Sequence, residues 1–167
     1  MKKVLPFAGL IAFVLALVAL ILMLATNGVI VTSGNLQVNY AGTTVLFGKT
    51  ESTILGDVVT KPSVLALIGF ILLVVGLLAA CAGVLGGLLK VKALQKLGGL
   101  LALVAAGCFL VAGIFMFLAV PTFYSANDAN VPDGAALGAG WVIGGILFIL
   151  AGGVAASPVV LGLLGKK

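Results

Sequence analysis

The sequence contains no histidine and no arginine. Histidine is the commonest general base and metal ligand in proteins, and arginine is the usual bidentate clamp for phosphate. Charged residues make up only 8% of the chain, whereas a soluble domain typically has about 25%. We therefore expect no metal site, no cofactor and no nucleic-acid partner, and a surface whose natural solvent is lipid.

Cysteine is also scarce. Cys81 and Cys108 are the only two, and both lie inside apolar runs. Neither is in a loop, so the sequence offers no extracellular disulfide framework. A reactive thiolate needs electropositive surroundings, which these runs lack. We interpret both cysteines as packing residues and expect no catalytic residue and no enzymatic activity.

Long apolar runs dominate the rest of the chain, which is 63% hydrophobic. Each of four runs is longer than the roughly 20 residues that cross a bilayer, and a span that must satisfy its own backbone in lipid is helical. The first run is too long for the apolar core of a signal peptide, which has about 7–15 residues. We predict one membrane domain over 1–167, with spans at about 4–26, 64–89, 97–120 and 135–164 and outer loops at 27–63 and 121–134.

The lysines indicate the orientation of these spans. Seven of the nine lie before the first span, between the second and third, or after the fourth. The two outer loops hold the other two lysines and all four acidic residues. The positive-inside rule then places both termini and the connection Lys90–Lys96 in the cytoplasm of a multi-pass protein of the cell membrane.

Small residues recur at seven-residue intervals in three spans. Such a repeat places them on one helix face, allows close backbone approach and favours left-handed crossing. We predict a left-handed four-helix transmembrane bundle with packing contacts at Gly69, Gly76, Gly83, Gly99, Ala106, Gly113, Gly138, Gly145 and Gly152. Span one instead carries alanines. Gly140 and Gly144 form a further pair that either extends the internal seam or contacts a second copy.

Aromatic side chains lie near the outer ends of two spans. Trp141 is close to the outer end of span four, and Phe123 and Tyr124 follow span three. Aromatic rings are enriched at the depth of the lipid headgroups. We therefore expect these three residues to anchor the bundle at the interface.

The first outer loop has the pattern of a small antiparallel sheet. The β-prone run Val29–Thr32 is followed by a turn signal at 33–35, and residues 36–40 alternate between apolar and polar. A third β-prone run, 43–47, follows a second turn signal. The free edge of this sheet either pairs with another chain or is covered by residues 49–60. The candidate partner contacts are Leu36, Val38 and Tyr40.

Four spans, both termini inside, a β-rich first outer loop and a short second one together resemble the claudin-type tetraspan layout. The resemblance covers the whole chain as topology only. Claudins carry a Trp-Gly-Leu-Trp and paired-cysteine signature in the first loop, and none of those residues is present here, where the only tryptophan is Trp141. No functional residue therefore carries over.

The spans hold no ionisable residue in their cores, which disfavours both intramembrane catalysis and an ion path. We predict a non-enzymatic structural, scaffold or accessory-subunit role, with the outer sheet presented for protein contact. The alternative is an oligomeric pore, either holin-like or channel-forming. The expected partners are membrane lipid and either another protein or further copies of the chain.

Overall fold

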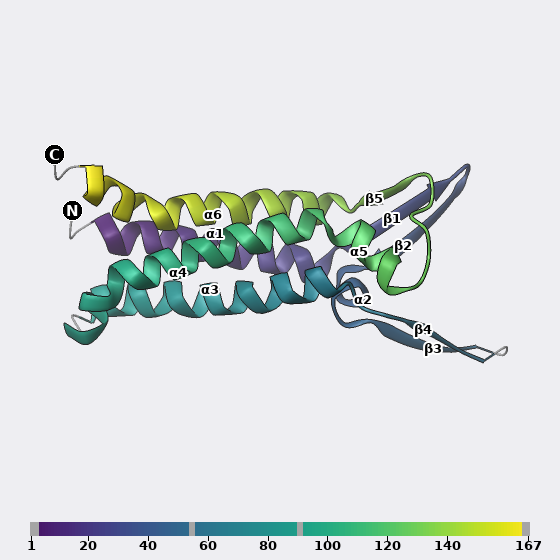
Figure 1. The fold of residues 1–167 in the computed structure, drawn as a ribbon, viewed down its shortest axis with the longest axis horizontal. Coiled ribbons are helices and arrows are strands. Elements are labelled where there is room, and N and C mark those ends of the chain that lie inside the picture. The colour runs from purple at the N-terminus through teal and green to yellow at the C-terminus, as the bar shows by residue number, and fades with distance from the viewer. Residues whose placement is uncertain (1–3, 54–55, 90–91, 165–167) are drawn as a thin grey trace.

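Four long helices run up and down side by side in the computed structural model, which describes residues 4–53, 56–89 and 92–164 (Figure 1). They are α1 (Val4–Ala25), α3 (Val64–Leu88), α4 (Lys92–Phe117) and α6 (Ala139–Leu164). Each contains a stretch long and apolar enough to cross a membrane. The chain is thus a multi-pass membrane protein with a tetraspan layout, as the hydrophobic runs predict.

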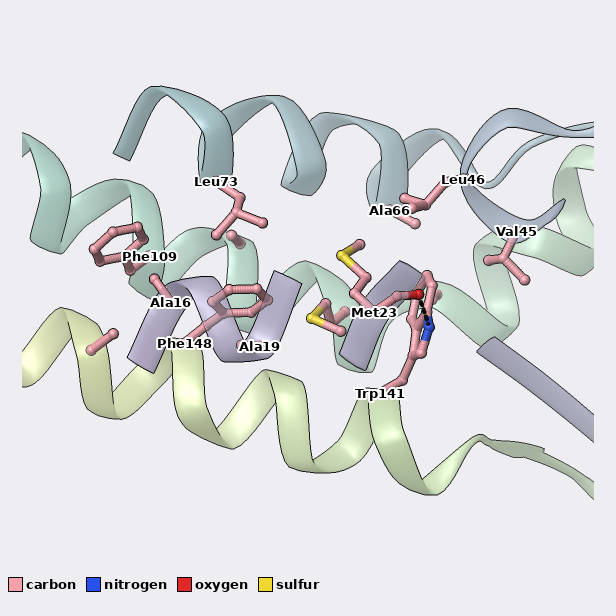
Figure 2. Packing of buried hydrophobic residues seen from close by; sticks show 14 of the residues in the cluster. Ala16, Ala19, Met23, Val45, Leu46, Ala66, Leu73, Phe109, Trp141 and Phe148 are labelled. Atoms are coloured by element: carbon pink, nitrogen blue, oxygen red, sulfur yellow. Dashed lines mark hydrogen bonds between the residues drawn. The ribbon is translucent and has the colours of Figure 1, made fainter. Parts of the chain in front are cut away.

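The four helices form a ring in which sequence neighbours touch. Helix α1 packs against α3 and α6, and α4 packs against the same two helices. Large apolar side chains fill the middle, among them Leu73, Phe109 and Phe148, each fully buried (Figure 2). Span one contributes alanines, of which Ala16 and Ala19 are fully buried. Their small size lets the backbone of α1 approach its neighbours closely.

The two ends of the bundle differ sharply. The start of α1, the end of α3, the start of α4 and the end of α6 lie together at one end (Figure 1). All strands of the described chain and the two short helices lie at the other. The latter is the end that the lysine distribution assigns to the outside, so we call it the outer end.

The outer end contains the small antiparallel sheet that the alternation predicts. Strands β1 (Asn27–Ser33) and β2 (Leu36–Ala41) form a hairpin, and the sheet order is β2-β1-β5. The third strand, β5 (Ala135–Leu137), comes from the other end of the sequence. The predicted start of span four at residue 135 is therefore wrong, because residues 135–137 pair with β1 and helix α6 begins only at Ala139.

The third β-prone run is also not a strand. Residues Gly42–Phe47 form the short helix α2, in which Val45 and Leu46 are both fully buried. Adjacent residues of a strand point to opposite faces of a sheet, so a strand could not bury both against one surface. A helical turn can, and burial of these two side chains overrides the β propensity of the run.

The described residues of this segment, 49–53 and 56–60, do not pair with the edge of the sheet. They form a second hairpin of β3 (Lys49–Thr53) and β4 (Gly56–Thr60), which pair only with each other. The two hairpins leave the bundle in diverging directions (Figure 1). Neither β3 nor β4 pairs with the free edge of β2.

The second outer loop contains a helix that the sequence prediction missed. Helix α4 ends at Phe117, before the predicted residue 120, and α5 (Ala119–Ala126) follows after a one-residue break. Pro121 causes the break, because it has no N–H to donate to the carbonyl of Phe117. As the third residue of α5, the proline stands where a helix needs no such donor.

Candidate interaction surface

The sheet is anchored to the bundle by Trp141. This side chain from α6 is fully buried, and its Nε1 donates a 2.9 Å hydrogen bond to the carbonyl oxygen of Met23 on α1 (Figure 2). The ring also lies against Gly28 and Gly42: a β-carbon on Gly42 would come within 2.8 Å of its Nε1, and one on Gly28 within 3.0 Å of its Cε2. Trp141 therefore joins the end of α1, the start of β1, α2 and α6 in one rigid joint.

Hairpin β1–β2 projects outward from this joint. The two strands are linked by a two-residue turn in which Gly34 has a φ of 59°. A glycine at the first central position is what such a tight turn requires. The register pairs Val31 with Val38 and Ser33 with Leu36, so these residues share one face of the sheet.

Apart from Ser33 near the turn, that face is apolar. It carries alternate residues of all three strands, since directly paired residues point to the same side. Its apolar members are Val29, Val31, Leu36, Val38, Tyr40, Ala135 and Leu137. Burial decreases outward along the hairpin, from Val29 at 0% exposed to Val38 at 52% and Leu36 at 76%. The outer part is thus an uncovered apolar surface.

Helix α5 supports the base of the same face. The rings of Tyr40 and Phe123 lie 5.0 Å apart at 59°, and the ring of Phe123 meets that of Tyr124 edge-on at 5.6 Å. Both α5 aromatics are buried. Burial, with a smaller contribution from the nearby Tyr40, raises the pKa of Tyr124. Tyr40 is therefore a packing residue at the base of the hairpin, and only Leu36 and Val38 of the three candidate contacts are openly exposed.

Polar contacts fix α5 to the start of α3. The Asn127 amide accepts a 2.7 Å hydrogen bond from the backbone N–H of Lys61 and donates one of 3.0 Å to the carbonyl of the same residue. The Lys61 ammonium lies 2.9 Å from the Asp128 carboxylate and lowers the pKa of that carboxyl. Next to them, the buried Ser63 hydroxyl meets the Thr122 hydroxyl at 2.6 Å. The two outer loops are thus held together as one unit.

The strand edges differ in how they are protected. Unpaired edges normally carry charges, prolines or bulges, or are very short, which prevents pairing with other chains. Strand β5 has only three residues and follows Pro132 and Asp133. Strand β3 carries Lys49 and Glu51 in an ion pair of 2.6 Å, and β4 carries Asp57. Strand β2 has no charge and no proline in its six residues.

The aromatic anchors predicted at the lipid interface lie elsewhere. Trp141, Phe123 and Tyr124 are at the outer end of the bundle, but all three are buried inside the protein. Each packs at a junction between elements, which removes it from contact with lipid. Sequence position gave their depth along the bundle correctly, whereas only tertiary packing determines whether a ring points in or out.

Several predicted packing glycines do lie at close helix contacts. A β-carbon on Gly76 of α3 would come within 2.7 Å of the Phe109 ring of α4. One on Gly69 would lie 3.3 Å from another α4 side chain, and one on Gly113 would lie 3.0 Å from the carbonyl oxygen of Gly145 on α6. At these points the helices approach as closely as the absence of a side chain allows.

The remaining members of the pattern differ from one another. A β-carbon on Gly152 would lie 3.0 Å from the carbonyl oxygen of Ala106, which is itself buried. Gly83 has only an ordinary contact at 3.9 Å. Gly138 lies against the first carbonyl of β1 and not against a helix, and a β-carbon on Gly99 would meet nothing within 4 Å. The close helix contacts therefore extend from the outer end to the middle of the bundle, and the loosely packed Gly83 and Gly99 lie nearer the opposite end.

The second glycine pair faces inward. A β-carbon on Gly140 would collide with Thr26, and one on Gly144 would lie 3.4 Å from the carbonyl oxygen of Ala19 on α1 and 3.3 Å from Met116. Of the two alternatives for this pair, the structure shows the internal seam between α6 and α1.

The described residues contain no group of three or more cysteine or acidic side chains that could hold a metal ion. Cys81 and Cys108 are both free thiols and partly buried. No known protein family matches the chain, and no curated protein resembles it in sequence. The claudin resemblance therefore rests on the tetraspan layout alone.

Proposed function

We propose that this protein is a non-enzymatic scaffold or accessory subunit of a membrane assembly, which uses the outer sheet to contact another protein. The observation that carries the proposal is the apolar face at the end of hairpin β1–β2. Leu36 and Val38 are exposed on it although nothing in the layout of a membrane bundle requires apolar residues there.

Energetics favour a binding role for this face. Burying a side chain such as Leu or Val stabilises a complex by about 1.5–3 kcal/mol. The base of the hairpin is already fixed by Trp141, by the Tyr40–Phe123 contact and by pairing with β5. The segment is therefore already ordered, and a partner that binds it loses little affinity to the entropy cost of ordering it.

We further propose that the helices cross one another with left-handed geometry. The bundle then lies in the cell membrane, with both termini and Lys90–Lys96 in the cytoplasm. The lysine and acid distribution supports this orientation. Cysteines introduced at Ser52 and Asn130, both exposed, test it in a background without Cys81 and Cys108. They should react with an impermeant maleimide on intact cells. Reaction at Lys92→Cys instead would overturn the orientation.

A pair of matched substitutions tests the contact itself. Val38→Asp places a charge on the proposed surface, whereas Val59→Asp does so on β4, where the valine is 62% exposed. The native partner should remain with the Val59→Asp protein in mild detergent and be lost from the Val38→Asp protein. Circular dichroism of both variants must match the unsubstituted chain. If both variants retained the partner equally, this face would not be the contact with that partner.

An oligomeric pore is the second candidate. Gly107 and Gly153 favour it, because they are exposed on the outside of the bundle with nothing within 4 Å of a β-carbon, which leaves room for close lateral contact. The bundle interior disfavours it. A cavity between the helices, lined by Ala80, Gly83, Ala105 and Ala155, has only about 20 Å³, room for about one water molecule. Reproducible single-channel currents from the pure protein, abolished by Gly107→Leu, would support the pore over the scaffold.

A further inference from the structure

We propose that strand β2 pairs with β2 of a second copy of this chain, antiparallel and centred on Val38, with the two copies in facing membranes. This inference rests on the proposed function, since it identifies the partner of the same outer sheet. It is carried by the hydrogen-bonding pattern, the side-chain match and the direction of the strand.

The outer edge of β2 presents backbone groups that a strand can bind. The two-residue turn makes Ser33 and Leu36 a hydrogen-bonded pair. Such pairs alternate with non-bonded ones along an antiparallel ladder, so Gln37 and Asn39 direct their N–H and C=O groups away from β1. Both residues are exposed, and no other strand of the described chain pairs with this edge.

This edge also lacks the usual protection against pairing. Every other strand edge at the outer end is charged, or is short and next to a proline, whereas Leu36–Ala41 is uncharged and regular. An uncharged edge with an apolar face favours the addition of a strand. Like charges directly opposite one another destabilise a sheet, and pairing of β2 with itself places none there.

The strand matches itself in the register centred on Val38. There Val38 lies opposite its own counterpart, and Leu36 lies opposite the second copy's Tyr40, so apolar residues meet on one face. On the other face Gln37 lies opposite the second copy's Asn39, and amide meets amide. Directly opposed pairs of these kinds are the stabilising unit of a sheet. The register overlaps nearly the whole of Leu36–Ala41 and joins two sheets into one.

The strand direction then determines how the copies are placed. Hairpin β1–β2 continues roughly along the long axis of the bundle (Figure 1). Two copies in one bilayer have the same orientation, so their β2 strands would run in the same direction. Antiparallel pairing requires a twofold axis across the strands, which turns one bundle to point against the other. The contact therefore joins two membranes whose outer surfaces face each other.

Disulfide trapping in the full chain tests this geometry. In a background without Cys81 and Cys108, Val38→Cys would bring two Cα atoms to about 4.5 Å, within the range of a disulfide. Gln37→Cys is the matched control, because its counterpart lies diagonally at about 7–8 Å. Two differently tagged preparations are reconstituted either in separate liposomes that are then mixed or together in the same liposomes. Both samples are oxidised with copper phenanthroline and blocked with a thiol reagent before extraction. We expect about tenfold more mixed-tag dimer from Val38→Cys than from Gln37→Cys.

Charge substitutions on the opposite face provide a second test. Gln37→Glu with Asn39→Glu sets like charges opposite each other in this register, whereas Gln37→Glu with Asn39→Lys sets opposite ones. The first pair should abolish trapping through Val38→Cys, and the second should restore it. Because both pairs leave β1–β2 hydrogen bonds in place, circular dichroism should not distinguish them.

Three results would overturn the inference: no mixed-tag dimer, equal dimer from the two cysteine positions, or dimer only when both tags share one liposome. The proposed function is tested separately from this inference. If trapping is absent and Val38→Asp still removes a different protein partner, the sheet binds that protein and not a second copy.

Discussion

Replacing Trp141 by phenylalanine should lower the free energy of unfolding more than replacing any other aromatic residue at the outer end by phenylalanine. The indole joins α6 to α1 by donating to the carbonyl oxygen of Met23, one of the last carbonyls of α1 that lack a partner within the helix. Phenylalanine keeps an aromatic ring at this fully buried position but removes the donor and part of the volume.

The magnitude follows from two losses. A buried acceptor left without its donor costs about 1–3 kcal/mol. The smaller ring leaves an additional void, and roughly 40 Å³ of empty space costs about 1 kcal/mol. The free energy of unfolding should therefore fall by about 2–4 kcal/mol for Trp141→Phe. The close contacts at Gly28 and Gly42 hold the surrounding backbone in place, which limits collapse into the void.

Denaturant titration in mild detergent, followed by circular dichroism, measures this change. Phe7→Ala is the control, because Phe7 is 68% exposed on the bundle surface and its loss should cost less than about 0.5 kcal/mol. Trp141 is the only tryptophan, so the unsubstituted protein should also show emission that is shielded from acrylamide until it unfolds. If Trp141→Phe is no more destabilising than Phe7→Ala, Trp141 does not hold the joint.

Three further predictions concern the bundle and its outer contacts. Gly76→Leu and Gly145→Leu should each lower the free energy of unfolding by about 1–3 kcal/mol through overpacking, while Gly153→Leu, with open space around it, should not. Ser63→Ala removes the cap that accepts from the third backbone N–H of α3 and should cost about 0.5–2 kcal/mol by the same titration. Asp128→Asn should lower the melting temperature at neutral pH but not below the pKa of the folded carboxyl. That pKa is depressed by Lys61, so the stabilisation is present above the unfolded pKa of about 3.9 and is lost as the pH falls. Asparagine tolerates the φ of 54° at this position, and a constant difference at all pH values would exclude the ion pair as its cause.

The helices were predictable because their signal is strong and local. In lipid the length and polarity of a run determine a span almost without competition, and α1 and α3 begin and end within a residue of the predicted limits. The first hairpin was predictable for a similar reason, since Gly34 and the alternation of residues 36–40 specify both the turn and the register. These features depend on contacts between residues close in sequence.

Most of the errors involve contacts between residues far apart. Residues 135–137 are apolar and continue smoothly into span four, so only the edge of β1, more than 100 residues earlier, makes them a strand. Val45 and Leu46 have β propensity, and only the joint around Trp141 favours a helix. Pro121 was a local signal for the break between α4 and α5. It was visible in the sequence and could have limited span three.

The arrangement at the outer end explains how so small a sheet is held in place. A two-stranded hairpin is marginal in water alone, and this one gains its support only near the bundle, through Trp141, Phe123 and β5. Support and exposure therefore change in opposite directions along the same strands, from the fully buried Val29 to Leu36. Contact with a further strand at β2 would bury the apolar residues that the bundle is too distant to cover. The part of the hairpin with least support from its own chain is thus the part with most to gain from a partner.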